Sequence, residues 1–541
     1  MRDKKRFGAM LDMSRNAVMK PEQVKKYARI LSGFGYNTLL LYTEDTYEVK
    51  NEPYFGLMRG RYTQAELRDI DGYCTSLGIE LIPCIQTLAH LESIFVWAVY
   101  HDHAHDTADV LLADAKRTYV LIENMFATIS ETFTSKTVHI GMDEAFMLGL
   151  GEFKRRYGEQ DAFEVFNRHL YKVLSLAEKY GLNPIMWSDM IFRLTSGEDF
   201  GTLNGQTPEI PQEQAKQIPQ NVGLVYWDYY RKEEGGYAER IRNHRALGNE
   251  VWFAGGALSW FGFSSANAAT LTYMAPAMRA CRKQQVDNVM LTLWGDNGKE
   301  CSYYALLPSL CAVKCIYDGE ERESVWKEKF LKVMGESFDD FMALDIPNFV
   351  GGNDYALLNM GKAMFYADPF LGYFDTTVVE SVPEEYAQAA KKYRLAAQSS
   401  GYAYLFEYLA ALCDFLNVKY DLGWRTYLAY QAKNREALVK ATADYQTALD
   451  RLDAFFDRFR KVWFTENKPH GFEVQEQRIG GLMLRLKSCK RRLNEYLNSE
   501  IDTIPELEEK RLDYYGNEER EFVKKAPWSY HWSRTVTPNV M

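Results

Sequence analysis

The chain has 541 residues, of which 47% are hydrophobic and 26% charged, and a net charge of −10. This length predicts two or three domains. The negative charge argues against nucleic acid or an anionic membrane as the main partner, and no apolar run reaches the roughly 20 residues that span a bilayer. The charged N-terminus lacks the long apolar run of a secretory signal. The eight scattered cysteines are therefore expected to be reduced core residues, and we expect a cytoplasmic protein.

The first 320 residues predict a regular alternation of strands and helices. Strands are expected at 7–13, 38–43, 80–86, 137–142, 184–187, 222–227, 250–254 and 289–294. Helices are expected at 21–34, 63–77, 109–133, 163–180, 236–247, 266–285 and 302–316. Thr63 and Glu66 have the spacing of a capping box at the start of the second helix.

Eight strands alternating with these helices predict a parallel sheet with helical crossovers. Their span suits a (β/α)₈ TIM barrel in residues 1–320. A doubly wound open sheet is the alternative, but it usually has a glycine-rich first turn, and residues 12–15 contain no glycine. The fold class expected is therefore α/β, with a (β/α)₈ barrel.

Residues 321–541 have a different pattern, typical of a mainly α-helical C-terminal domain. Apolar residues recur at helical spacing in two long segments joined by residues 467–471. The first set is Leu438, Ala441, Tyr445, Leu449, Leu452, Phe456, Phe459 and Trp463, and the second is Ile479, Leu482, Leu486, Cys489, Leu493 and Tyr496. These are the core stripes of antiparallel helices. The aromatic end, residues 527–532, suggests a short extended segment.

Acids and tryptophans recur where the predicted strands end, which in barrels is where chemistry is placed. Taken in chain order, and with Arg15, His90 and Tyr229 included, the residues at these strand ends are Arg15, Glu44, Asp45, His90, Asp143, Glu144, Trp187, Asp189, Trp227, Asp228, Tyr229, Trp260, Trp294 and Asp296. Tryptophans around a polar cleft suit a sugar ring, although any one of them could be ordinary core. Arg15 could pair with Asp12 or Glu44, and His90 could be a satisfied loop histidine. Asp143 and Glu144 could simply begin the next helix.

The segment His139-x-Gly141-x-Asp143-Glu144 resembles the signature of glycoside hydrolase family 20, the exo-acting β-N-acetylhexosaminidases. Shorter segments that also resemble the family's sequence pattern are Ser14-Arg15 and residues 186–189 and 293–296. The chain is similar to the intracellular bacterial branch, which begins at the barrel and ends in a helical region. We therefore expect no counterpart of the N-terminal α+β domain that the secreted members carry.

The resemblance implies hydrolysis of terminal β-linked GlcNAc or GalNAc with help from the substrate's own 2-acetamido group. Glu144 would protonate the leaving oxygen and later activate water, so it must hold a proton near neutral pH, whereas ionised Asp143 would orient the acetamido group. Arg15 would bind ring hydroxyls and Asp296 the far hydroxyls of the terminal sugar.

The family resemblance also implies roles for the aromatic residues and for His90. Trp187, Trp227 and Trp294 would wall the acetamido pocket and the floor under the sugar ring, and Trp260 would stack at the pocket edge or on the leaving sugar. Tyr229, with Tyr230 close behind, matches the tyrosine that steadies the acetamido oxygen. His90 lies in a segment that loosely follows the family's histidine-bearing loop. The implied mechanism needs no cofactor or metal.

Two alternatives stay open at this point. A metal-dependent barrel hydrolase could use His101, His103 and His105, but no matching acid motif follows and a solvated loop is favoured. Cys311 and Cys315 share a helix face and are expected in the core. A non-catalytic sugar-binding protein would not need an ionisable pair.

The helical region could pack on its own barrel or form a dimer interface, and we favour a homodimer.

Overall fold

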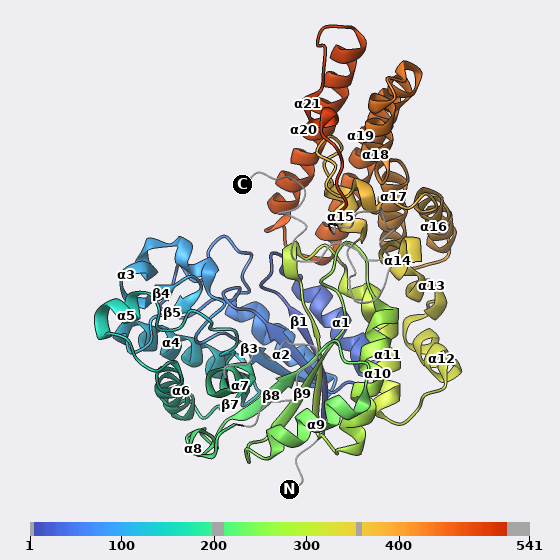
Figure 1. Cartoon of the computed structure of the whole chain (residues 1–541). Helices are drawn as coiled ribbons and strands as arrows, with labels where there is room; N and C mark the ends of the chain where they lie inside the picture. Colours follow the sequence, from blue (N-terminus) through green and yellow to red (C-terminus); the bar gives the residue numbers. More distant parts are fainter. Residues whose placement is uncertain (1–4, 197–209, 353–359, 515, 517–541) are drawn as a thin grey trace. The chain divides into compact units, whose positions relative to one another are not determined.

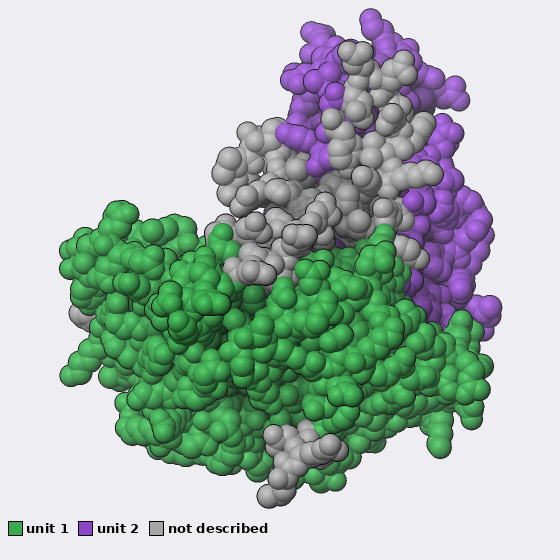
Figure 2. Space-filling model, turned by 60° about the horizontal axis from the view of Figure 1, so that its bottom comes forward, with its two compact units in different colours: residues 1–257, 270–294, 309–335 green, residues 258–269, 295–308, 336–541 purple. Residues whose placement is uncertain are grey.

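The computed structural model describes residues 5–196, 210–352, 360–514 and 516. The chain divides into two compact units (Figure 2). Unit 1 comprises residues 1–257, 270–294 and 309–335, and unit 2 comprises residues 258–269, 295–308 and 336–541. Two segments that follow barrel strands in the sequence thus belong to the helical unit. The boundary expected between residues 320 and 321 stays a prediction.

Unit 1 contains a closed barrel of eight parallel strands, as expected (Figure 1). Around the barrel the strand order is β1-β10-β9-β8-β7-β6-β3-β2. The strands are β1 (Arg6–Asp12), β2 (Thr38–Tyr42), β3 (Glu80–Cys84), β6 (Thr137–His139), β7 (Asn183–Trp187), β8 (Gly223–Trp227), β9 (Val251–Gly256) and β10 (Asn288–Leu293). Because all pairs are parallel, every carboxyl end lies at the same rim of the barrel.

Helices follow the strands where the sequence predicts them. They are α1 (Pro21–Phe34), α2 (Gln64–Ser76), α4 (Lys116–Thr132), α6 (Ala162–Lys179), α9 (Glu234–Arg245), α10 (Asn267–Lys283) and α11 (Leu307–Tyr317). Helix α1 has Pro21 in its first turn, buries Tyr27 and Leu31, and ends at Gly35 with φ 90°. Proline at the start and a left-handed glycine at the end are the usual boundaries of a helix.

The region after β3 differs from the expectation. The helix predicted from residue 109 begins only at Lys116, because residues 110–111 form β5 (Val110–Leu111), which pairs antiparallel with β4 (His105–Thr107). The loop expected at residues 101–105 is also wrong in its backbone, although His101 is exposed as a solvated segment requires. Residues 101–104 form the short helix α3 (His101–Ala104), and the His105 ring stacks on Phe95 with centroids 4.0 Å apart.

Unit 2 is helical, and its two longest helices are α19 (Arg435–Glu466) and α20 (Phe472–Leu497). Their predicted core stripes are buried, with two corrections. Phe455 is buried rather than Phe456, because a step of three from Leu452 keeps it on the packed face. Leu497 is buried rather than Tyr496, because there a step of four from Leu493 does so. The aromatic segment 527–532 lies outside the described residues.

All eight cysteines are buried and free of disulfides, as expected. Their burial in apolar surroundings makes them core residues, and it raises the pKa of the Cys74 thiol to about 12. Among the described residues, no helix combines the length and apolar character that crossing a membrane requires.

The capping box of α2 gives a test of how the sequence sets a helix start. Thr63 Oγ1 accepts from the Glu66 amide at 3.1 Å, and the Glu66 carboxylate accepts from the Thr63 amide at 2.8 Å. Thr63→Ala should lower the free energy of unfolding by about 1 kcal/mol in urea denaturation. Thr63→Ser keeps the hydroxyl and should therefore retain most of the free energy of unfolding that Thr63→Ala loses. Equal losses in both variants would contradict this account.

Candidate functional site

The two adjacent acids at the end of β6 lie in different surroundings. The backbone takes left-handed conformations at Gly141, Met142 and Glu144, with φ of 73°, 75° and 48°. As a result the Asp143 side chain is 11% exposed, whereas that of Glu144 is 42% exposed. Neither residue begins a helix, so that alternative is wrong. The pair therefore has one buried and one accessible carboxyl.

Asp143 is held by two side chains from the segment after β3. Gln86 Nε2 donates to its Oδ1 at 2.8 Å, and His90 Nε2 lies 3.1 Å from its Oδ2 and 3.5 Å from Glu144 Oε2. Burial opposes ionisation of Asp143, but the charge and hydrogen bond of His90 and the amide of Gln86 outweigh it and lower its pKa. Burial likewise acts to lower the pKa of His90, and Asp143 raises it to about 10. The two groups form a buried ion pair.

Gln86 was not among the expected site residues, and Gly141 explains how it reaches Asp143. A Cβ on Gly141 would lie 1.9 Å from Gln86 Oε1, so only glycine leaves room for the amide. Gln86 Nε2 also donates to the Tyr42 hydroxyl at 2.9 Å, which in turn donates to Glu44 Oε1 at 2.9 Å. The available signal in the sequence was a glutamine two residues beyond a buried strand.

Asp189, at the start of α7 (Asp189–Ser196), fixes the backbone of Glu144. Its Oδ2 accepts from the Glu144 amide at 3.0 Å, and the Trp227 side chain also hydrogen-bonds to it. Burial, followed by the negative charge of Asp143, raises the pKa of Asp189 to about 8. At neutral pH this third carboxyl therefore holds a proton, while Asp143 is ionised.

Arg15, after β1, lies among both polar and aromatic groups. Its guanidinium donates to Asp12 Oδ2 at 3.3 Å and lies 3.7 Å from Glu44 Oε1, so both salt bridges considered from the sequence exist. It also lies over the rings of Tyr42 and Trp294, at 4.9 and 4.7 Å from their centroids. These contacts fix the planar fork of donors. Its binding to sugar hydroxyls stays a prediction.

Four predicted aromatic residues at or just after the ends of β7, β8 and β10 form one cluster. Trp294 Nε1 donates to the Tyr229 hydroxyl at 3.0 Å, and the Tyr229 ring stacks on Trp227 with centroids 5.4 Å apart. Trp187 lies 6.0 Å from Trp294 between centroids and is 1% exposed. Tyr230 meets Tyr229 edge-on at 6.0 Å. Trp187 is thus a buried support of the cluster, whereas Trp227 is partly exposed.

The other two predicted residues belong to unit 2. Trp260 is buried, and its ring lies 5.6 Å from that of Phe261. Asp296 begins the short 3-10 helix η3 (Asp296–Gly298). Unit 1 thus brings together Arg15 and seven other predicted residues, while the roles of Trp260 and Asp296 stay predictions from the sequence. The seven are His90, Asp143, Glu144, Trp187, Trp227, Tyr229 and Trp294.

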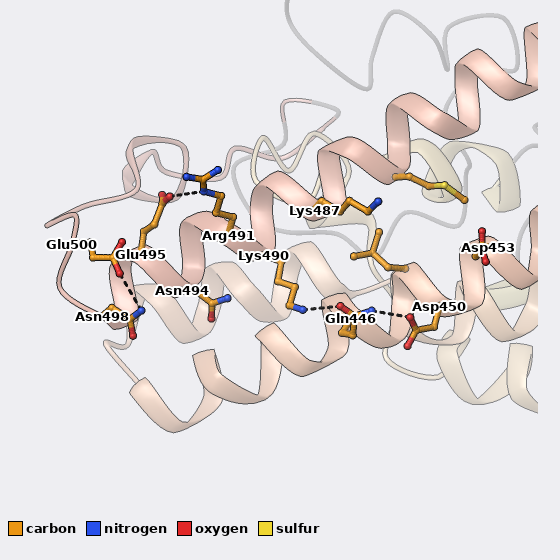
Figure 3. Close-up of a pocket in the computed structure, with 12 residues that line it drawn as sticks. Gln446, Asp450, Asp453, Lys487, Lys490, Arg491, Asn494, Glu495, Asn498 and Glu500 are labelled. Carbon is orange, nitrogen blue, oxygen red and sulfur yellow. Dashed lines mark hydrogen bonds and ion pairs between the residues drawn. The ribbon is translucent and has the colours of Figure 1, made fainter.

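Other polar clusters offer less chemistry. No group of three or more metal-ligating side chains occurs among the described residues, which exclude the side chains of Asp102 and His103. A hollow between α19 and α20 is lined mainly by polar and charged residues, several of which hydrogen-bond to one another (Figure 3). Lys490 donates to Gln446, which donates to Asp450, at 2.6 and 2.7 Å.

The barrel and its acid pair define the class of protein, and the chain belongs to glycoside hydrolase family 20. The model "Glycosyl hydrolase family 20, catalytic domain" matches residues 6–240, and "Glycoside Hydrolase 20C C-terminal domain" matches residues 339–526. Together they span more than half of the chain. This confirms the family inferred from the signature around Asp143.

Individual relatives are distant. Hexosaminidase D of Bos taurus is 25% identical over 213 residues, covering 37% of this chain and 56% of the relative. Hexosaminidase D of Homo sapiens is 26% identical over 216 residues, covering 37% of this chain and 40% of the relative. The chain thus spans about half the length of these relatives. A solved exo β-N-acetylglucosaminidase from Vibrio harveyi is 16% identical with a TM-score of 0.46, covering 61% of this chain and 57% of that one.

The buried ion pair predicts a pH-dependent contribution to stability. Because the pKa of His90 is about 10 in the fold and 6.5 when unperturbed, its protonated ring stabilises fully below 6.5, and this contribution is lost as pH rises toward 10. The difference in free energy of unfolding between the native protein and His90→Gln, from urea denaturation, should therefore shrink from about pH 6 to about pH 10.

The control for this prediction is the same comparison in an Asp143→Asn background. There the imidazole has lost its anionic partner, so the difference should be nearly constant above about pH 7. A constant difference in the native background as well would mean that Asp143 does not raise the pKa of His90.

Proposed function

We propose that the protein is an exo-β-N-acetylhexosaminidase that removes terminal β-linked GlcNAc or GalNAc from glycans by retaining, substrate-assisted catalysis. The observation that carries this proposal is the pairing of a buried, ionised Asp143 with an accessible Glu144 beside it. A glycosidase that borrows its nucleophile from the substrate needs one carboxyl for proton transfer and another for positioning, instead of a carboxylate nucleophile.

Asp143 acts on the substrate's 2-acetamido group. A carboxylate has about four lone-pair positions, and Gln86 and His90 use two of them. The remaining lone pairs can accept the acetamido N–H, which turns the carbonyl oxygen toward the anomeric carbon. As that oxygen forms its bond to C1, positive charge spreads onto the nitrogen, and the negative Asp143 stabilises it.

Glu144 acts on the leaving group. Its proton passes to the glycosidic oxygen as the C1–O bond breaks, and the oxazolinium ion forms. The Glu144 carboxylate then takes a proton from water, whose oxygen attacks C1 and reopens the ring with overall retention of configuration. The hydrogen bond from its amide to Asp189 fixes the backbone from which the side chain reaches the substrate.

Sugar recognition uses the remaining predicted residues. Arg15 binds ring hydroxyls with its fixed fork of donors, and Asp296 binds the far hydroxyls. Trp187, Trp227 and Trp294 wall the acetamido pocket, with Tyr229 steadying the acetamido oxygen and Trp260 at the pocket edge. The mechanism uses no metal or cofactor. A cytoplasmic location is supported by the eight free cysteines, and a homodimer is proposed on the sequence alone.

The proposal is tested by hydrolysis of a chromogenic GlcNAc β-glycoside beside the same glycoside of glucose. Glucose has a hydroxyl in place of the acetamido group and cannot form the oxazolinium ion. We expect the glucoside to react slower by at least about a hundredfold in kcat/KM, since it lacks the intramolecular nucleophile. Equal turnover would overturn the mechanism, and loss of both activities with a chelator would favour a metal-dependent hydrolase.

The two acids should respond differently to substitution. Glu144→Gln should lower kcat about a hundredfold or more on a substrate with a poor leaving group, and a very acidic phenol should rescue most of it because it departs without a proton. Asp143→Asn should show a similar loss with little rescue. Glu152→Gln is the control, at a partly exposed acid of α5 (Glu152–Tyr157) that pairs with Arg155 and Arg156 outside the site. Equal rescue of both site variants would contradict the division of roles.

A further inference from the structure

The segment that carries Asp296 has a backbone that needs external support. Asn297, Gly298 and Lys299 are three consecutive residues with positive φ, at 62°, 116° and 58°. Left-handed conformations are costly for residues with a Cβ and persist where the surrounding structure imposes them. Such a run directly after a predicted sugar-binding acid raises the question of what imposes it.

Side chains from two helices of unit 2 hold this segment by its carbonyl groups. Lys362, on α15 (Met360–Tyr366), donates to the Asn297 carbonyl at 3.1 Å, and Arg478 of α20 donates to the same oxygen at 2.6 Å. Gln475, one turn earlier on α20, donates to the Gly298 carbonyl at 2.9 Å. A Cβ on Gly298 would lie 2.5 Å from Arg478 Nη1, so the glycine permits this close approach.

A buried ion pair anchors the far end of the same segment. Lys362 Nζ lies 2.7 Å from Glu300 Oε1, and both side chains are 2% exposed. Arg478 Nη1 is 3.4 Å from the same oxygen. Burial lowers the pKa of Lys362 to about 8, while Glu300 and, more weakly, Asp296 act to raise it. Removing either partner of this buried pair would leave an uncompensated charge, so the contact between Lys362 and Glu300 is costly to break.

The segment that carries Trp260 is held by the same unit. The Phe263 ring packs against Phe365 and Phe455, with centroids 4.8 and 5.5 Å apart. Asn348 Nδ2 donates to the carbonyls of Ser264 and Ser265 at 3.2 and 2.9 Å. Both segments that bear predicted recognition residues thus pack within the helical unit.

We propose that the helical C-terminal region determines sugar recognition, with Lys362, Arg478 and Gln475 as positioning residues that present Asp296 to the far hydroxyls of the terminal sugar. The three side chains fix residues 297–300 and thereby the orientation of the residue before them. This rests on the proposed function, because it takes Asp296 as a substrate-binding acid.

The test compares Arg478→Met with Arg485→Met. Arg485 lies two turns further along α20, is 29% exposed against 28% for Arg478, and pairs with Asp368 at 2.6 Å without contacting the segment. On a GlcNAc β-glycoside we expect Arg478→Met to raise KM about tenfold, the effect of roughly one hydrogen bond to a charged group, with kcat within about twofold. Arg485→Met should leave both unchanged. Equal KM values for the two variants would overturn the proposal.

A double-mutant cycle separates positioning from general loosening. If Arg478 acts through Asp296, Arg478→Met should raise KM no further in an Asp296→Ala background. The native enzyme should also discriminate against a substrate that lacks the C4 hydroxyl, and Arg478→Met should reduce that discrimination. Additive effects in the cycle would overturn the proposal. If Arg478→Met does not fold, as judged by circular dichroism, Arg478→Lys is carried through the same cycle.

The outcomes distinguish this proposal from the proposed function. Equal turnover of GlcNAc and glucose glycosides by the native protein would refute the mechanism assigned to Asp143 and Glu144. An unchanged KM in Asp296→Ala, with that preference intact, would refute only the role of Asp296 and with it the positioning proposal.

Discussion

The charged contact between Asp143 and His90 is the interaction on which the rest of the site depends. A carboxylate buried at the end of a barrel strand is unfavourable unless opposite charge and hydrogen bonds compensate it. His90 supplies the charge at 3.1 Å, and Gln86 supplies the hydrogen bond at 2.8 Å. Gly141 follows from this requirement, because any side chain there would displace the amide. Local backbone geometry and electrostatics therefore form one arrangement.

The same contact separates the functions of two neighbouring acids. Asp143 is buried in its ion pair with His90, whereas the left-handed backbone at Glu144 directs the Glu144 side chain toward solvent. Asp189 completes the arrangement: it holds the Glu144 amide, and the negative charge of Asp143 helps to keep it protonated at neutral pH. A family that uses the substrate's own nucleophile needs such a division between an ionised and a proton-transferring group.

The sequence predicted most of the barrel, because its strands and helices have strong periodicity and clear boundaries such as Pro21, Gly35 and the Thr63 capping box. It predicted the strand-end residues because the ends of the predicted strands were themselves clear. It did not predict β4 and β5, because strands of three and two residues are too short to show an alternating pattern. Nor did it reveal Gln86 and Asp189 as partners of the acid pair, because hydrogen bonds between different strands have no sequence periodicity.

The helical unit illustrates a further limit of sequence patterns. The stripes of α19 and α20 predicted a packed pair of helices, and they form one. Arg478 and Gln475, however, precede Ile479, the first residue of the predicted stripe, and from the sequence they look like ordinary solvated residues, although Gln475 is buried. Their significance depends on the left-handed run at residues 297–299, which only the fold brings against α20.

The most direct measurement of the central claim is the protonation state of the buried carboxyls, obtained by infrared difference spectroscopy. The spectrum of the native protein minus Asp143→Asn, recorded at neutral pH, should contain carboxylate bands. The spectrum of the native protein minus Asp189→Asn should contain the C=O band of a carboxylic acid, and this band should disappear as the pH rises through about 8. A protonated Asp143 at neutral pH would contradict the account, because it could not stabilise the charge that develops on the acetamido group.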